Sequence, residues 1–216
     1  TAGPDPAPGA GANLVIRDGR LAAVREGYER FDPRAYLQNN YVPPRADFSS
    51  EDCVVPWKLR CLAETFASGE GVEPWQEKER RLRGRLRRIL PIDVHRPDPL
   101  GSPLRPPADA LLSAFCLEAV SPDRATFARA LGHVGSLLRP GGHAVLLGAL
   151  GESFYLAGAA RLPVVPLAED DVRGALAGAG FVLRRFCSYA MPPALRTGVD
   201  DVDSVFFAHA QKPMEA

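Results

Sequence analysis

The chain contains 216 residues, of which 46% are hydrophobic, so it is long enough for one sizeable core and too short to require two domains. Its 26 basic residues balance 26 acidic residues, which excludes a strong overall attraction to nucleic acid or to an anionic membrane. No apolar run approaches the ~20 residues that a transmembrane helix needs. We therefore expect a soluble protein with one globular domain over residues 21–216.

Residues 1–20 are expected to form a disordered leader. The first thirteen are mainly Ala, Gly and Pro, and they lack both the basic start and the apolar stretch of a secretion signal. The four cysteines, Cys53, Cys61, Cys116 and Cys187, contain no C-x-x-C pair, and Cys116 lies in an apolar run that is typical of a core residue. This pattern indicates reduced thiols and a cytoplasmic protein.

The N-terminal half is predicted to be mainly helical. Residues 21–37 mix apolar and charged side chains at helical spacing, and Asp32-Pro33 divides them into two helices because proline is favoured in a first turn. Residues 57–67 and 75–88 predict two further helices. A short strand is expected over residues 89–95, followed by an extended, proline-rich connection.

The second of these further helices is strongly basic, with seven Lys or Arg among residues 78–88. One interpretation is a nucleic-acid contact, but the chain has no recognisable DNA- or RNA-binding motif. A helical apolar stripe is formed by Leu82, Leu86, Ile89 and Leu90. We therefore favour a solvated helix face and expect no nucleic-acid partner.

The C-terminal half alternates between strands and helices. An apolar strand is predicted first, then a helix that Ser121 caps, and then a turn at Gly141-Gly142. The order is strand, helix, strand, helix, strand and strand, over residues 110–117, 121–138, 143–150, 168–179, 181–191 and 204–211. This order predicts an α/β fold with a doubly wound parallel sheet, in which the last strand is free to pair antiparallel.

Five stretches between residues 28 and 212 carry a family resemblance. They are FDPRAYLQNNYVPPR, PWKLRCLAETFASGE, ADALLSAFCLEAVSPD, LLRPGGHAVLLGALGESFYLAGAARL and TGVDDVDSVFFAHAQK. Together they resemble the family shared by the phenylethanolamine, nicotinamide and indolethylamine N-methyltransferases. The resemblance implies a class I, Rossmann-like methyltransferase that uses S-adenosyl-L-methionine, needs no metal, acts on a small arylethanolamine, and works as a monomer away from membranes.

The chain departs from this family between Gly69 and Trp75. Family members have a strand, a loop of the DIGSGPT type, a helix and a second strand with a terminal acidic residue at this place. Two βα units of ~30 residues each are thus missing, and the sheet is expected to be incomplete, lacking its first strands. The missing loop approaches the cofactor, so the alternative to an active enzyme is an inactive truncated isoform or an incomplete gene model.

The resemblance also assigns cofactor-binding residues: Tyr28, Tyr36, Tyr41, Asp93, Val94 and Ala114. Tyrosine suits a lid over a ligand, because its ring is apolar and its tip is polar. Asp93 is implied to accept from the adenine amino group. The alternatives are packing of an N-terminal helical cap for the tyrosines and an ordinary turn for Asp93.

The resemblance implies that Glu118 and Glu152 are catalytic, holding the substrate amine and helping to deprotonate it, while Asp200 contacts the hydroxyl end. A carboxylate fits both tasks, since an ammonium needs an anionic acceptor and must lose a proton before it attacks a methyl carbon. Both glutamates follow strands at the edge where α/β folds place ligands. The alternative is that these carboxylates are solvated loop residues.

Further substrate contacts follow from the same resemblance. They are Asn40, Arg45, Lys58, Phe115, Glu152 and Tyr155, with Val54, Met191 and Val202 as an apolar wall. Phe115 could equally pack in the core, and Arg45 and Lys58 could equally be surface charges.

Overall fold

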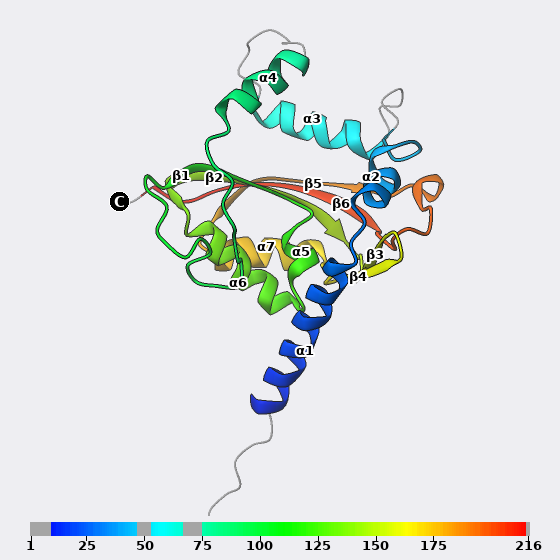
Figure 1. Ribbon diagram of the computed structural model, residues 1–216. Coiled ribbons are helices and arrows are strands. Elements are labelled where there is room, and N and C mark those ends of the chain that lie inside the picture. Colours follow the sequence, from blue (N-terminus) through cyan, green and yellow to red (C-terminus); the bar gives the residue numbers. More distant parts are fainter. Residues whose placement is uncertain (1–9, 47–52, 67–74, 215–216) are drawn as a thin grey trace, which may run out of the picture.

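The computed structural model describes residues 10–46, 53–66 and 75–214. A four-stranded sheet forms its centre (Figure 1). In spatial order the strands are β1 (Ala108–Ala114), β2 (Leu138–Leu150), β6 (Ser204–Gln211) and β5 (Val182–Ala190). β1 and β2 are parallel, whereas β6 is antiparallel to both β2 and β5. The sheet is therefore mixed, because the chain returns from β5 to β6 without a crossover α-helix.

Helices cover both faces of this sheet (Figure 1). α3 (Val54–Phe66) lies on one face against β5 and β6, while α6 (Arg124–Gly135) and α7 (Glu169–Gly178) pack together on the other. The buried stripe predicted for α6 is confirmed, since Phe127 and Leu131 are almost fully buried. The predicted cap at Ser121 is wrong, because the helix begins at Arg124 and Asp123 caps it. Between β1 and α6, the short helix α5 (Leu117–Val120) replaces the end of the predicted strand.

The N-terminal helices pack against a small hairpin formed by β3 (Phe154–Ala157) and β4 (Ala160–Pro163). α1 (Ala10–Glu29) ends just before the predicted break, and α2 (Pro33–Tyr41) begins at the predicted proline. The side chain of Asp32 caps α2, accepting from the backbone N–H of Arg34 at 2.9 Å. The predicted leader is corrected from Ala10 onward, because those residues begin α1, while residues 1–9 lie outside the described residues.

β1 is an edge strand, and within the described ranges no strand pairs with its outer side. Leu112 on this strand is 62% exposed. The short strand predicted over residues 89–95 is wrong: the chain has no strand there, and Ile89 is 88% exposed. A strand requires a partner for its backbone hydrogen bonds, and a free edge such as that of β1 is what an incomplete sheet leaves.

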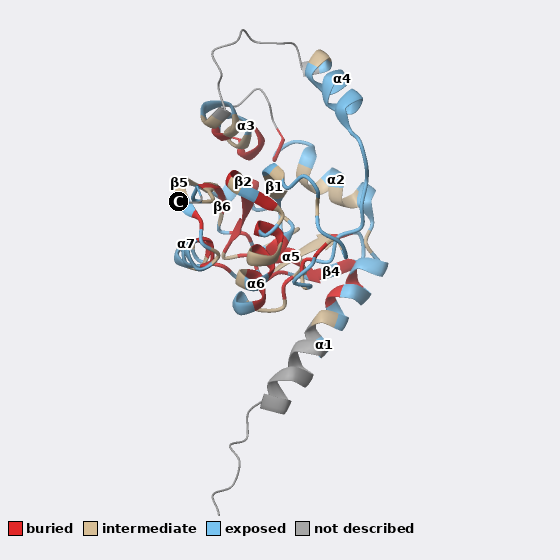
Figure 2. Cartoon of the chain, turned by 90° about the vertical axis from the view of Figure 1, so that its left-hand side faces the viewer, coloured by how far each residue is buried: buried red, intermediate tan, exposed pale blue. Residues whose placement is uncertain are grey.

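α4 (Trp75–Arg85) and the segment after it run along the outside of the molecule (Figure 2). The apolar stripe predicted on this basic helix does not pack against the core, since Leu82 is 71% and Leu86 is 65% exposed. Periodicity indicates a helix but does not supply a surface to cover its apolar face.

Three further details differ from expectation or add to it. The predicted turn at Gly141-Gly142 lies inside β2, where Gly141 has a φ of 73° that favours glycine. Cys116, predicted to be a core residue, is exposed. Within residues 10–46, 53–66 and 75–214, no helix has the length and apolar character needed to cross a membrane.

Candidate functional site

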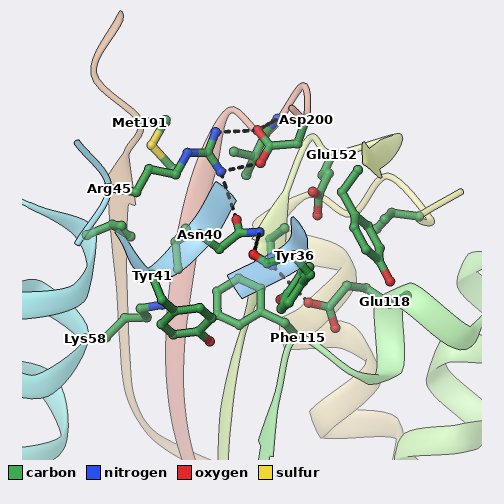
Figure 3. Close-up of a pocket in the computed structure, with 17 residues that line it drawn as sticks. Tyr36, Asn40, Tyr41, Arg45, Lys58, Phe115, Glu118, Glu152, Met191 and Asp200 are labelled. Carbon is green, nitrogen blue, oxygen red and sulfur yellow. Dashed lines mark hydrogen bonds and ion pairs between the residues drawn. The ribbon is translucent and has the colours of Figure 1, made fainter. Parts of the chain in front are cut away.

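A cavity opens where the carboxyl ends of β1 and β2 meet α2, α3 and the β3–β4 hairpin (Figure 3). Ten residues predicted to contact substrate or cofactor line it together: Tyr36, Asn40, Tyr41, Arg45, Lys58, Phe115, Glu118, Glu152, Tyr155 and Asp200. Val54, Met191 and Val202 contribute apolar wall, as predicted. Tyr36 and Tyr41, expected on the cofactor side, thus share one cavity with the predicted substrate residues.

Glu118 lies in the first turn of α5, directly after β1, and is only 3% exposed. Its Oε1 accepts a hydrogen bond from the backbone N–H of Ala149 at 3.1 Å. Burial outweighs this hydrogen bond and raises the pKa of Glu118 to about 7. Gly148 makes room for the carboxyl group, because a Cβ at that position would lie 2.7 Å from Glu118 Oε1.

Glu152 follows β2 and is 9% exposed. Burial raises its pKa to about 8, the negative charges of Asp200 and Glu118 add to the increase, and Arg45 partly opposes it. Glu118 and Glu152 project from the same side of the cavity in Figure 3. Two carboxyl groups that exchange protons near neutral pH are suited to general acid–base chemistry.

Arg45 and Asp200 form a buried ion pair at the edge of the cavity. Their side chains are only 4% and 6% exposed, so the interpretation of Arg45 as a surface charge is wrong. Arg45 donates through Nη2 to Asp200 Oδ1 at 2.8 Å and through Nη1 to Asp200 Oδ2. It also donates to Asn40 Oδ1 at 3.2 Å and to the carbonyl of Leu195 at 3.1 Å. The pair therefore fixes Asp200 and Asn40 in place.

Lys58 lies in α3, on the other side of the cavity from Glu118 in Figure 3. Its ammonium is 4.8 Å from the centre of the Phe115 ring and 5.6 Å from that of Tyr41, which are cation–π distances. Burial lowers the pKa of Lys58, and the positive charge of Arg45 contributes to the decrease. Lys58 thus helps to line the cavity and stacks on its aromatic wall.

Phe115 lines the cavity and also packs against core residues. It is therefore both a cavity residue and part of the core, the two alternatives that the sequence left open. Among the described residues it is the only one other than glycine with a positive φ, of 50°. Its backbone N–H is held by the carbonyl of Leu147 at 2.8 Å. Strained backbone of this kind is typical of functional sites, where it aims a side chain.

A second cavity holds three of the residues predicted for the cofactor: Tyr28, Asp93 and Val94. The Tyr155 hydroxyl, in the first cavity, donates to the Tyr28 hydroxyl at 2.8 Å and so links the two cavities. Ala114 is exposed at the end of β1 and lines neither of these cavities, so its prediction as a contact finds no support in this geometry.

The second cavity fits the adenine end of a nucleoside. Val94 and Val120 supply an apolar wall, and Asp93 supplies a carboxylate. The Nδ1 atom of His95 is buried and has no hydrogen-bond partner among the described residues, so it is available to a polar ligand atom. The described chain supplies no glycine-rich loop beside these residues for the ribose and methionine end.

Sequence reasoning missed several residues of the first cavity. They are Ala119, Ala149, Val164 and Val205. These are small or β-branched residues that the pattern shows as ordinary core. The one usable signal was Gly148, because a glycine inside an apolar strand marks a close approach by another group.

The chain combines an α/β sheet with buried carboxyl groups at its carboxyl edge, and the match to known proteins identifies it as a Rossmann-like enzyme of the methyltransferase class. The chain belongs to the NNMT/PNMT/TEMT family, whose model matches residues 19–74 and, separately, residues 67–213. It is 47% identical to phenylethanolamine N-methyltransferase of Macaca mulatta and also 47% identical to that of Homo sapiens. Each alignment runs over 278 positions and covers 97% of this chain and 98% of the relative.

Human nicotinamide N-methyltransferase is 42% identical over 110 residues, or 51% of this chain and 42% of the relative. A solved structure of the 1,6-didemethyltoxoflavin-N1-methyltransferase of Burkholderia thailandensis is 18% identical, with a TM-score of 0.46, and covers 97% of this chain and 94% of that chain. The predictions of the family, of an S-adenosylmethionine-dependent N-methyltransferase and of the α/β fold class are confirmed.

Proposed function

We propose that this chain methylates the primary amine of phenylethanolamines, with S-adenosyl-L-methionine as methyl donor. The observation that carries the proposal is the pair of buried carboxyl groups, Glu118 and Glu152, in a cavity with aromatic walls. Phe115, Tyr36 and Tyr41 offer apolar surface to an aryl ring. The family match and the identity to phenylethanolamine N-methyltransferases support the same substrate class.

The two glutamates together perform two tasks in this proposal: they hold the substrate amine and accept its proton. An arylethanolamine arrives as an ammonium ion, so an ionised carboxylate is needed to hold it inside the cavity. The amine must then give up a proton to expose its lone pair. With pKa values raised to about 7 and about 8, the carboxyl groups of Glu118 and Glu152 accept that proton more readily than an ordinary glutamate.

In this proposal, Asp200 receives the hydroxyl of the substrate. Its Oδ1 accepts from Arg45 and, at 3.4 Å, from the backbone N–H of Val202, whereas its Oδ2 accepts from Arg45 alone and retains a lone pair for a further donor. Because Arg45 is fixed by Asn40 and the carbonyl of Leu195, the position of Asp200 is set before the substrate binds. Such preorganisation is what holds an amine in line for attack.

When bound, S-adenosyl-L-methionine supplies an electrophilic methyl group on a sulfonium ion. The residues that would hold its adenine end are Asp93, Val94 and Tyr28, in the second cavity. Tyr28 and Tyr155, hydrogen-bonded to each other, form the boundary between this cavity and the amine site.

The test is transfer of a labelled methyl group from S-adenosyl-L-methionine to a phenylethanolamine by the purified chain. We expect product with the native chain and a loss of at least about tenfold with Glu152→Gln, in line with the loss of one general base. Amine binding is measured separately by calorimetry. Native protein that binds the amine and S-adenosyl-L-methionine but forms no product would contradict the proposal.

A second candidate function is amine binding without methyl transfer. It is favoured by the free edge of β1 and by the alignments, which run over 278 positions against 216 residues in this chain. The two family matches meet at residues 67–74, where the sequence departs from the family pattern. Calorimetric heat with the amine and none with S-adenosyl-L-methionine would favour this candidate. Action as a monomer in the cytoplasm stays a prediction.

A further inference from the structure

Two cysteines that are far apart in the sequence meet on the face of the sheet covered by α3. Cys61 lies in α3 and is 4% exposed, and Cys187 lies at the middle of β5. Cys187 packs against the apolar cluster of Cys61, Val145, Leu147 and Phe207, and its thiol is in hydrogen-bond contact with that of Cys61. Both are free thiols. They lie outside the two cavities described above.

Arg185 holds this contact together from β5. Its Nε donates to Cys187 Sγ at 3.2 Å, and its Nη2 donates to Glu64 Oε2 at 2.5 Å. Its Nη1 also reaches Thr65 Oγ1 at 3.3 Å. Because Glu64 and Thr65 belong to the last turns of α3, Arg185 ties that end of the helix to β5 beside the two sulfurs. The same guanidinium places a positive charge against the sulfur of Cys187.

The two thiols differ in their environment. Burial is the main cause that raises the pKa of Cys61, so this thiol resists ionisation. Cys187 is half-buried and touches a cation, which favours its sulfur as the one that attacks an oxidant first. A partly accessible sulfur beside a second, buried thiol is the usual arrangement of an attacking and a resolving cysteine.

We propose that Cys61 and Cys187 form a redox-modification site that a peroxide converts into a disulfide linking α3 to β5. The Cys187 thiolate attacks one oxygen of hydrogen peroxide, an S–O bond forms, the O–O bond breaks, and the first water leaves. Cys61 sulfur then attacks that sulfenic acid, the S–S bond forms, the S–O bond breaks, and the second water leaves. Two thiols lose two protons and two electrons, which reduce the peroxide.

The disulfide would restrain α3, the helix that carries part of the first cavity, where we propose that the amine binds. Lys58 lies one turn before Cys61 in α3 and lines that cavity, as does Val54. A link to β5, an edge strand of the sheet, restrains α3 in both the folded and the unfolded chain. The inference does not rest on the proposed methyl transfer, because the thiols lie outside the amine cavity.

The experiment uses the full chain with Cys116→Ser, which removes the exposed thiol. After brief treatment with stoichiometric hydrogen peroxide, free thiols are alkylated and the protein is digested with trypsin without reduction. Cleavage after Arg60, Lys78, Arg185 and Arg196 places Cys61 in residues 61–78 and Cys187 in residues 186–196. Mass spectrometry is expected to find these two peptides linked, and reductant to separate them.

Two controls sharpen this result. Arg185→Gln is expected to slow linkage about tenfold, because it removes a charged hydrogen bond to the attacking sulfur. In this variant trypsin cleaves after Arg184, so Cys187 is followed in residues 185–196. Arg184→Gln is the matched control: Arg184 bonds to Gln211 instead, and its loss leaves the rate unchanged. Linkage raises the midpoint of thermal unfolding by on the order of 10 °C. Peptides 61–78 and 186–196 that remain separate, or Cys61 linked to Cys53, would overturn the proposal.

Discussion

Replacement of Asp200 by asparagine is expected to destabilise the protein strongly. The structure shows two charged hydrogen bonds between Asp200 and Arg45, with side-chain exposures of 6% and 4%. The substituted amide would retain the shape of the side chain, but would leave the guanidinium of Arg45 without a counter-charge inside the protein. Breaking a buried ion pair from one side costs about 3–5 kcal/mol, because the remaining charge stays desolvated.

The assay is urea unfolding at neutral pH, followed by circular dichroism, for native protein and the Asp200→Asn variant. Asp109→Asn is the matched control, since Asp109 and Arg139 form an ion pair at 2.6 Å whose side chains are 84% and 47% exposed. Solvent screens that pair, so its loss should change the free energy of unfolding by less than about 1 kcal/mol. Equal effects of the two variants would refute the reasoning from burial.

Three other outcomes are expected. Because burial raises the pKa of Glu118 to about 7 and of Glu152 to about 8, from an ordinary 4.5, the folded protein keeps protons that the unfolded chain has lost. The free energy of unfolding should therefore fall as pH rises from about 4.5 to about 8. Urea unfolding at several pH values should show a weaker dependence of this free energy on pH for Glu152→Gln than for the native protein. An equally strong dependence in the variant would show this reasoning to be wrong. Gly148→Ala should lower the free energy of unfolding by about 1–3 kcal/mol, because its Cβ would lie 2.6 Å from the Phe206 ring and would displace Glu118. Gly132→Ala is the control: a Cβ there would meet nothing within 4 Å, so the same assay should show no loss of stability. Removing the N-cap of α6 with Asp123→Ala should cost about 1 kcal/mol by thermal unfolding, since its Oδ1 accepts from the Thr126 backbone N–H at 2.7 Å; an unchanged midpoint would exclude a capping role.

Local rules in the sequence predicted much of the secondary structure. Asp32 and Pro33 mark the start of α2, since a cap and a first-turn proline act within a few residues. The spacing of Phe127 and Leu131 identifies the buried face of α6 for the same reason. Residues 89–95 show the limit: they have the composition of a strand, but pairing needs a neighbour, and composition carries no information about one.

The candidate site, too, could be predicted from the sequence only in part. The family resemblance named most of the side chains that line the first cavity, and Glu118 and Glu152 were expected because both follow strands that end at one edge. The sequence did not reveal that Arg45 is buried against Asp200, that Tyr36 and Tyr41 share the amine cavity, or that Cys61 lies against Cys187. Those contacts join residues more than a hundred positions apart, or depend on the angle at which elements meet.

By itself, the sequence determined the family, the helical N-terminal half and the identity of the carboxylates, because motifs and periodicity are local properties of the chain. Only the tertiary structure decided the protonation behaviour of Glu118 and Glu152, since their pKa values depend on burial and on neighbouring charges. It also decided that β1 is a free edge, with Leu112 in solvent. Burial and pairing are relations between distant segments, and they exist only once the chain has folded.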